Sequence, residues 1–231
     1  MLQIQKNYSS TFYGILSLPA TAMGFALCVQ ISALSWLLST QYKLDIHEVG
    51  IVWAAGPIAG IIGQVVIGLI SDKVWFWGGR RKPFILIGGS IAAISLLALT
   101  ALGEISQFTG ISLLAIAIIV ALTLDLSINI SFNPTRSIIA DVTPEGEKRT
   151  KGYTWMQTIS GMFGVMAYAI GAYFGNYSLI YFGILLVFLF SIIPPFFISE
   201  PRSISSTDSL ENQNSTTKSQ QGQLYRIYLA H

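Results

Sequence analysis

The stretch DLSINISFNPTRSIIAD, residues 125–141, carries carboxylates, amides and a guanidinium, and it directly follows the almost entirely apolar run ISLLAIAIIVALTL. If the stretch continues one helix, Asp125, Asn129, Asn133 and Arg136 follow one another at spacings of four, four and three residues. Side chains at these spacings lie on one face of an α-helix. Polar groups on a membrane-type helix are costly in lipid and normally face a water-filled path or the protein interior. We therefore expect this face to line a path for a solute.

The overall composition also indicates a membrane protein. Of the 231 residues, 52% are apolar and 10% are charged, and the mean hydropathy is +0.61. A soluble domain carries about 25% charged residues. The net charge of +2 is too small to suggest nucleic acid as a partner. The partner that this composition predicts is the lipid bilayer.

No motif for enzymatic chemistry or for a cofactor is present in the sequence. The single cysteine, Cys28, excludes an internal disulfide framework, and His47 and His231 have no partners at metal-ligand spacing. The chain has no GxxxxGK[ST], HExxH or GxSxG pattern. We therefore expect neither an enzyme nor a bound metal or cofactor.

Six apolar segments are long enough to cross a bilayer, which takes about 20 residues in a helix. The first is not a cleavable signal peptide, because it is too long for a signal-peptide core. The sequence thus predicts an all-α membrane protein. The expected spans are 12–39, 49–70, 83–102, 111–132, 154–174 and 179–198.

The cations divide unevenly between the two sets of connections. The N-terminal segment, the second and fourth loops and the C-terminal tail together carry 12 Lys and Arg residues, whereas the other loops carry only Lys43. Cytoplasmic loops are enriched in Lys and Arg. This pattern predicts a multi-pass protein with both termini in the cytoplasm, and we expect it in a plasma or inner membrane.

The chain divides into three predicted regions. Residues 1–11 form a cytoplasmic N-terminal segment, and residues 12–199 form the helical bundle. Residues 200–231 are rich in Ser, Thr, Asn and Gln and almost free of aliphatic side chains at first. Such a composition cannot bury enough apolar surface to offset its ordering entropy, so we expect a disordered cytoplasmic tail.

The candidate residues within the membrane are one carboxylate and several amides. Asp125 is a candidate for binding a coupling proton or cation or for accepting a hydrogen bond from a solute; the alternative is a structural acid paired with a neighbouring helix. Asn129 and Asn133 suit hydroxyl-rich solutes, or else they bond two helices together. Gln30 and Gln64 are further candidates for solute contact, with packing as the alternative.

A second group of candidates lies in GLISDKVWFWGGRRKP, residues 68–83. Asp72 is expected to face Arg80 and Arg81 across a short loop, where the ion pairs could latch one conformation of a moving bundle. A plain positive-inside loop is the alternative. Arg136 is eleven residues from Asp125, about 16 Å along a helix, so we expect Arg136 at the cytoplasmic mouth, near Asp141 or Asp72.

Glycine spacing suggests close contacts between helices. Gly56 and Gly60 form one GxxxG pattern, and Gly171 and Gly175 form another. Small residues at this spacing allow the backbones of membrane helices to approach each other. We interpret both patterns as ordinary packing rather than as a dimer interface.

These motifs resemble a known family. The loop from Gly68 to Pro83 resembles the conserved loop between helices two and three of major facilitator superfamily transporters. Its long gap between Asp72 and Gly79 is similar to that of the sucrose-transporter and glycoside–pentoside–hexuronide cation symporter branch. The run LDLSINI at 124–130, followed by Pro134, Arg136 and Asp141, is also similar to that branch, and so is the pattern WxxGPxxG at 53–60.

The resemblance implies a fold and a function. The six segments would form the N-terminal half of the fold, itself a 3+3 inverted repeat, with the solute site between two such halves. The family's important fourth-helix aspartate and arginine fall on Asp125 and Arg136, and its loop latch falls on Asp72, Arg80 and Arg81. The expected activity is transport of a sugar or glycoside with H⁺ or Na⁺ by alternating access. The alternative is a non-transporting six-helix fragment or an assembly partner of a transporter.

Overall fold

The computed structural model describes residues 8–200, except for the side chains at 55, 62, 64–69 and 71–73. These residues form helices, together with one isolated β-bridge between Phe76 and Gly79. The first helix runs as α2 (Ser10–Val29) and continues through two π-helical segments, η1 (Gln30–Leu34) and η2 (Leu37–Gln41). The other helices are α3 (Ile46–Lys73), α4 (Lys82–Thr100), α5 (Leu102–Thr109), α6 (Leu113–Val142), α7 (Glu147–Phe174) and α8 (Asn176–Phe197).

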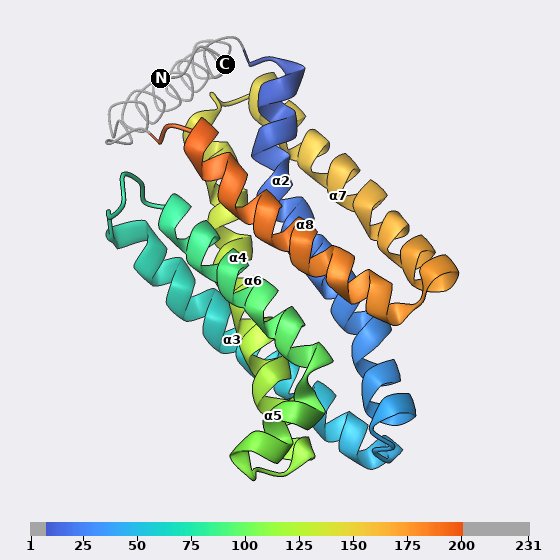
Figure 1. The fold of residues 1–231 in the computed structure, drawn as a ribbon. Helices are drawn as coiled ribbons and strands as arrows, with labels where there is room; N and C mark the ends of the chain where they lie inside the picture. Colours follow the sequence, from blue (N-terminus) through green and yellow to red (C-terminus); the bar gives the residue numbers. More distant parts are fainter. Residues whose placement is uncertain (1–7, 201–231) are drawn as a thin grey trace, which may run out of the picture. The chain divides into compact units, whose positions relative to one another are not determined.

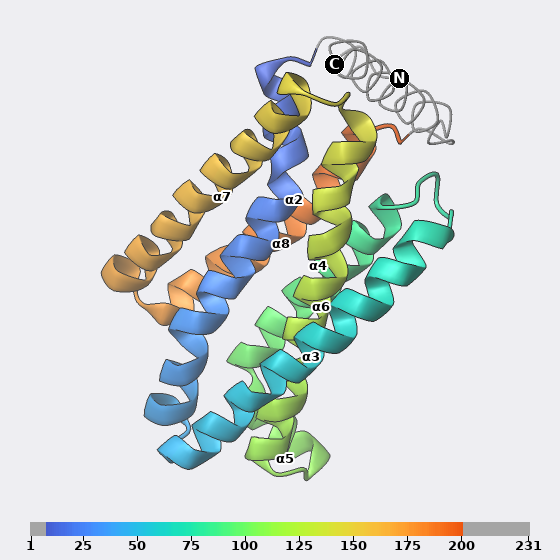
Figure 2. The same ribbon diagram turned by 180° about the vertical axis from the view of Figure 1, so that it is seen from behind.

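Two helices hold the bundle together. α2 packs against α7 and α8, and α6 packs against α3 and α4 (Figures 1 and 2). α4 and α8 also pack against each other, which joins the two groups. The main core consists mostly of apolar side chains from α2, η1, α4, α6 and α8, among them Phe25, Leu34, Leu96 and Leu124, each fully buried. The described part of the chain therefore forms one bundle, and its compact unit ends at Glu200.

The helix ends follow from local sequence. Asp45 and Glu48 form a capping box at the start of α3, in which each side chain accepts a hydrogen bond from the other residue's backbone N–H. Ser9 and Ser112 cap α2 and α6. Gly110 ends α5 at φ 72°, and Gly175 separates α7 from α8 at φ 86°, a region of φ that glycine adopts without steric cost.

The helices coincide with the predicted apolar segments, but fewer of them qualify as membrane spans. Within the described residues, four helices are long and apolar enough to cross a membrane, namely Ser10–Gln41, Lys82–Thr100, Leu113–Val142 and Asn176–Phe197. In α3, the apolar stretch Ile46–Ile61 is shorter. α7 begins with the charged segment EKRTK and is less apolar along its length. The chain is thus a multi-pass helical membrane protein; crossings by α3 and α7 stay a prediction.

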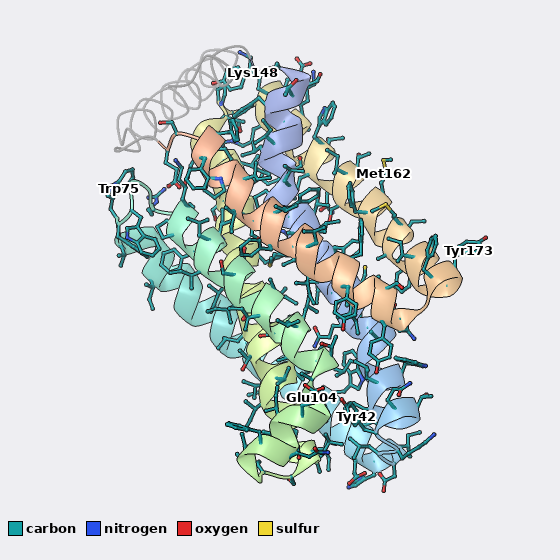
Figure 3. The ribbon with its side chains drawn as sticks, viewed as in Figure 1. Tyr42, Trp75, Glu104, Lys148, Met162 and Tyr173 are labelled. Carbon is teal, nitrogen blue, oxygen red and sulfur yellow. The ribbon has the colours of Figure 1, made fainter. Side chains whose placement is uncertain are left out.

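The positive charges gather at one end of the bundle. Lys148, in the first turn of α7, and Trp75, in the loop before α4, lie toward one end, whereas Tyr42 and Glu104 lie at the opposite end (Figure 3). The loop before α4 and the connection between α6 and α7 carry the basic residues, and Lys43 follows Tyr42 at the other end. The two basic loops that the sequence assigns to one side of the membrane therefore lie at one end of the bundle.

The glycines on α3 and those at the end of α7 have different roles. A Cβ atom on Gly56 would lie 2.9 Å from Asp125 Oδ2, and one on Gly63 would lie 3.0 Å from Asn129 Cβ. These α3 glycines allow close contact with α6, as the packing interpretation predicts. Gly175, in contrast, lies beyond the end of α7 in the connection to α8.

Gly88 brings the backbones of α4 and α6 into contact, so an alanine there should destabilise the bundle. A Cβ atom at Gly88 would lie 2.8 Å from the Ser127 carbonyl oxygen and 2.9 Å from the Ser131 nitrogen. We expect Gly88→Ala to lower the free energy of unfolding by about 1–3 kcal/mol, because main-chain atoms cannot rotate away. Unfolding by SDS in mixed micelles measures this value.

The matched control for this experiment is Gly14→Ala in α2. No heavy atom lies within 4 Å of a Cβ atom built at Gly14. This substitution should leave stability unchanged or raise it by up to ~1 kcal/mol, because alanine favours the helix. Equal effects of the two substitutions would contradict the packing of α4 on α6.

Candidate functional site

Asp125 lies in the middle of α6, and its carboxylate meets residues of two other helices. Its Oδ2 atom accepts a hydrogen bond from Gln30 Nε2 of η1 at 3.0 Å. On the α3 side it lies against Gly56, where a Cβ atom would lie 2.9 Å from Oδ2 and displace the carboxylate. The side chain is half-buried. No charged side chain among the described residues forms an ion pair with Asp125, so the amide of Gln30 is its polar partner.

The rest of the predicted face follows along α6. Asn129 donates from Nδ2 to the Asp125 carbonyl oxygen at 2.8 Å and lies against Gly60 and Gly63 of α3. Asn133 lies one turn further on and is half-buried. The structure therefore brings Asp125, Asn129 and Gln30 together. The side chain of Gln64 lies outside the described residues.

The first helix is π-helical at the level of this site. The segment Gln30–Leu34 begins with the residue that contacts Asp125. The next residue, Ser35, accepts a hydrogen bond from Trp53 Nε1 of α3 at 2.8 Å. π-Helical turns are rare and frequently occur at functional sites. Here the irregular part of the helix bears the polar contacts to both neighbours, α6 and α3.

A second polar cluster lies at the basic end of the bundle. Asp141, near the end of α6, accepts hydrogen bonds through Oδ2 from Arg80 Nη2 at 2.9 Å and from Arg81 Nε at 3.3 Å. These ion pairs connect α6 to the loop before α4. Asp72 is predicted from the sequence to face the same arginines, but its side chain lies outside the described residues.

Glu200 completes this cluster from the end of α8. Its carboxylate accepts hydrogen bonds from the backbone N–H groups of Arg80 at 2.7 Å, Arg81 at 2.9 Å and Lys82 at 2.8 Å. The first N–H groups of a helix have no partners within that helix and favour a negative charge. Gly79 makes room, because a Cβ atom there would lie 2.7 Å from Glu200 Oε1. Glu200 thus caps α4 and ties its start to the end of α8.

Arg136 lies apart from these ion pairs. Its guanidinium lies over the Phe132 ring, 4.5 Å from the centroid, and its carbonyl oxygen accepts a hydrogen bond from the Tyr153 hydroxyl. Asp141 instead pairs with Arg80 and Arg81. Of the two carboxylates that the sequence suggests as its neighbours, Asp141 forms its described ion pairs with other arginines. The side chain of Asp72 lies outside the described residues.

The contacts of two residues in these sites were not predicted from the sequence. Gly56 appeared only as a packing residue, although it is the α3 contact of the Asp125 carboxylate. Glu200 appeared as the first residue of the predicted tail. The only signal for Glu200 is its place before Pro201 as the first acidic residue after the last apolar run.

The fold and the sites together define a class of protein. The chain is a multi-pass helical membrane protein with a carboxylate within its bundle and an ion-paired cluster at one end. The model of the Major Facilitator Superfamily matches residues 15–229, and the chain belongs to that family. Its members are membrane transport proteins rather than enzymes.

Sugar transport proteins are among its relatives. The chain is 30% identical over 187 residues to sucrose transport protein SUT2 of Oryza sativa subsp. indica, a match covering 72% of this chain and 35% of that protein. It is 29% identical over 190 residues to the general alpha-glucoside permease of Schizosaccharomyces pombe, covering 74% and 34% of the two chains. It is 31% identical over 167 residues to sucrose transport protein SUC4 of Arabidopsis thaliana, covering 65% and 32%. The chain spans about a third of the length of these relatives.

Removing the carboxylate that caps α4 should loosen the basic end of the bundle. We expect Glu200→Ala to lower the free energy of unfolding by about 1.5–3 kcal/mol, the range for hydrogen bonds to a charged group. Hydrogen exchange at the backbone amides of residues 80–82 should become faster, which mass spectrometry of the purified protein can measure.

Glu145→Ala provides the control, because Glu145 also pairs with an arginine but its side chain is 73% exposed. Exposed pairs contribute about 0–1 kcal/mol, so exchange at residues 80–82 should be unchanged. Unchanged exchange at these amides in Glu200→Ala would contradict the cap.

Proposed function

We propose that this chain is the N-terminal six-helix half of a secondary active transporter that moves a sugar or glycoside together with H⁺ or Na⁺ by alternating access. The observation that carries the proposal is the half-buried Asp125 carboxylate, held by Gln30 within an apolar bundle. An ionisable residue at such a place marks an ion or substrate path in membrane proteins. The names of the relatives, sucrose transport proteins and an alpha-glucoside permease, support a sugar or glycoside as the solute.

In this proposal, Asp125 and the amides around it have different roles. Asp125 binds the coupling ion, and Asn129 and Asn133 offer amides to sugar hydroxyls. An amide can both donate and accept hydrogen bonds, which suits a hydroxyl group. Gln30 and Gln64 are proposed to complete the substrate and coupling site. A second six-helix half, from a second copy of this chain or from a partner, is proposed to close it from the other side, as in transporters built from two such halves.

The topology belongs to the same proposal. We propose six spans with both termini in the cytoplasm of a plasma or inner membrane, since the basic residues gather at the end where α2 begins and α8 ends. A 3+3 inverted repeat is supported by helix packing. α2 packs on the second and third helices of the later triplet, α7 and α8, and α6 packs on those of the earlier triplet, α3 and α4.

The cluster at the basic end is proposed as the cytoplasmic latch. The ion pairs of Asp141 with Arg80 and Arg81 join α6 to the loop before α4. If α6 moves against α4, either these ion pairs break or the loop moves with α6. Asp72 and Arg136 are proposed members of the same gate.

The experiment is uptake of radiolabelled sucrose or maltose into liposomes containing the purified chain, with an imposed pH or Na⁺ gradient. We expect gradient-driven uptake above that of empty liposomes. Asp125→Asn should reduce it about tenfold or more, the equivalent of losing at least 1.4 kcal/mol of interaction with the coupling ion.

Glu104→Gln is the matched control, because Glu104 is an exposed carboxylate in α5, far from Asp125 along the chain. Its uptake should equal that of the unmodified protein. If the chain never exceeds empty liposomes under any gradient, the alternative is favoured, a non-transporting six-helix chain or an assembly partner of a transporter.

A further inference from the structure

Only one of the two polar atoms of the Gln30 side chain has a hydrogen-bond partner among the described residues. Gln30 is only 2% exposed, and its Nε2 donates to Asp125 Oδ2. Its Oε1 atom is buried and, among the described residues, accepts no hydrogen bond. A buried acceptor without a donor destabilises a folded protein, because it has lost its hydrogen bonds to water. Such an atom beside a carboxylate requires an explanation.

The two ends of the amide suit the two states of a carboxyl group. An ionised Asp125 can only accept, so it takes a hydrogen bond from Nε2. A protonated Asp125 carries an O–H donor and needs an acceptor instead. Oε1 is that acceptor, and rotation of the amide about its Cγ–Cδ bond exchanges the two atoms. The rotation is local, because it leaves the Gln30 backbone in place.

Among the described residues around Asp125, Gln30 provides the side-chain hydrogen bond to its carboxylate. α3 brings Gly56, which has no side chain to bond with either state. On α2, the Cys28 side chain lies against α7, where a Cβ atom on Gly164 would lie 3.6 Å from its Sγ. The described charges of α6 beyond Asp125 are Arg136, which lies over Phe132, and Asp141, which pairs with Arg80 and Arg81. Other described charges on the helices around it lie at their ends, such as Glu48 and Lys82.

We propose that Gln30 is a positioning residue that holds Asp125 in both of its protonation states. It donates through Nε2 to the carboxylate and accepts through Oε1 from the carboxylic acid. The inference rests on the proposed function and specifies it, because it names the proton as the coupling ion. Gln30 connects the helix before α3 to α6, so proton loading at Asp125 replaces a charge-assisted hydrogen bond between these helices with a weaker neutral one.

The test uses nuclear magnetic resonance of the side-chain amides in the full chain, labelled with ¹⁵N-glutamine and placed in lipid nanodiscs. The Gln30 signals are those missing in Gln30→Met. We expect them to shift when the pH is lowered and to stay constant when Na⁺ is added at fixed pH. In Asp125→Asn they should no longer respond to pH. The side-chain signals of Gln157, an exposed residue of α7, should stay constant throughout.

Two results would overturn the proposal. One is a Gln30 signal that ignores pH, or that responds to pH equally in Asp125→Asn. The other is a response to Na⁺ alone. The measurement requires no uptake, so the two proposals can be tested separately. A chain that transports can contradict the role of Gln30, and a chain that does not transport can still support it. In a chain that transports, Gln30→Met should in addition change the pH profile of uptake, whereas Gln157→Met should not.

Discussion

The rest of the structure depends on placing one carboxylate, Asp125, in the middle of a helix that is otherwise apolar. Lipid offers no partner for this group, so α6 must turn that face away from lipid. The neighbours meet the requirement in two ways: α3 presents glycines that let its backbone approach, and η1 presents the Gln30 amide. The close packing of α3 on α6 and the polar contact to the first helix both follow from this single charge.

The same helix carries the cluster at the basic end, but on another side. Asp141 lies sixteen residues beyond Asp125, which places the two about 160° apart around a helix of 3.6 residues per turn. Asp125 thus faces α3 and the first helix, whereas Asp141 faces the loop before α4. A rotation or tilt of α6 would act on both contacts together. In the proposed transporter, this makes α6 the mechanical link between the intramembrane site and the gate.

The sequence predicted the helices and the place of Asp125 within one of them, because both signals are local. An apolar run of membrane length needs no knowledge of its neighbours, and a carboxylate within one is conspicuous. The partners of these groups could not be predicted, because they come from distant parts of the chain. Gln30 meets Asp125 across 95 residues, and Glu200 meets Arg80 across 120. Arg136 and Asp141 are close in sequence, but five residues place them about 140° apart on a helix, which explains why they do not pair. The π-helical segment had no recognisable sequence signal.

The central claim is that the face of α6 bearing Asp125, Asn129 and Asn133 borders a water-filled path rather than lipid. Cys28 is the only cysteine of the chain, so Cys28→Ser gives a background for labelling with a charged, membrane-impermeant thiol reagent. Asn129→Cys and Asn133→Cys should react, and sucrose or maltose should slow the reaction. Ile119→Cys, at a 55% exposed position of the same helix, should stay unreactive in lipid. Labelling of the two asparagine positions no faster than that of position 119 would contradict the account.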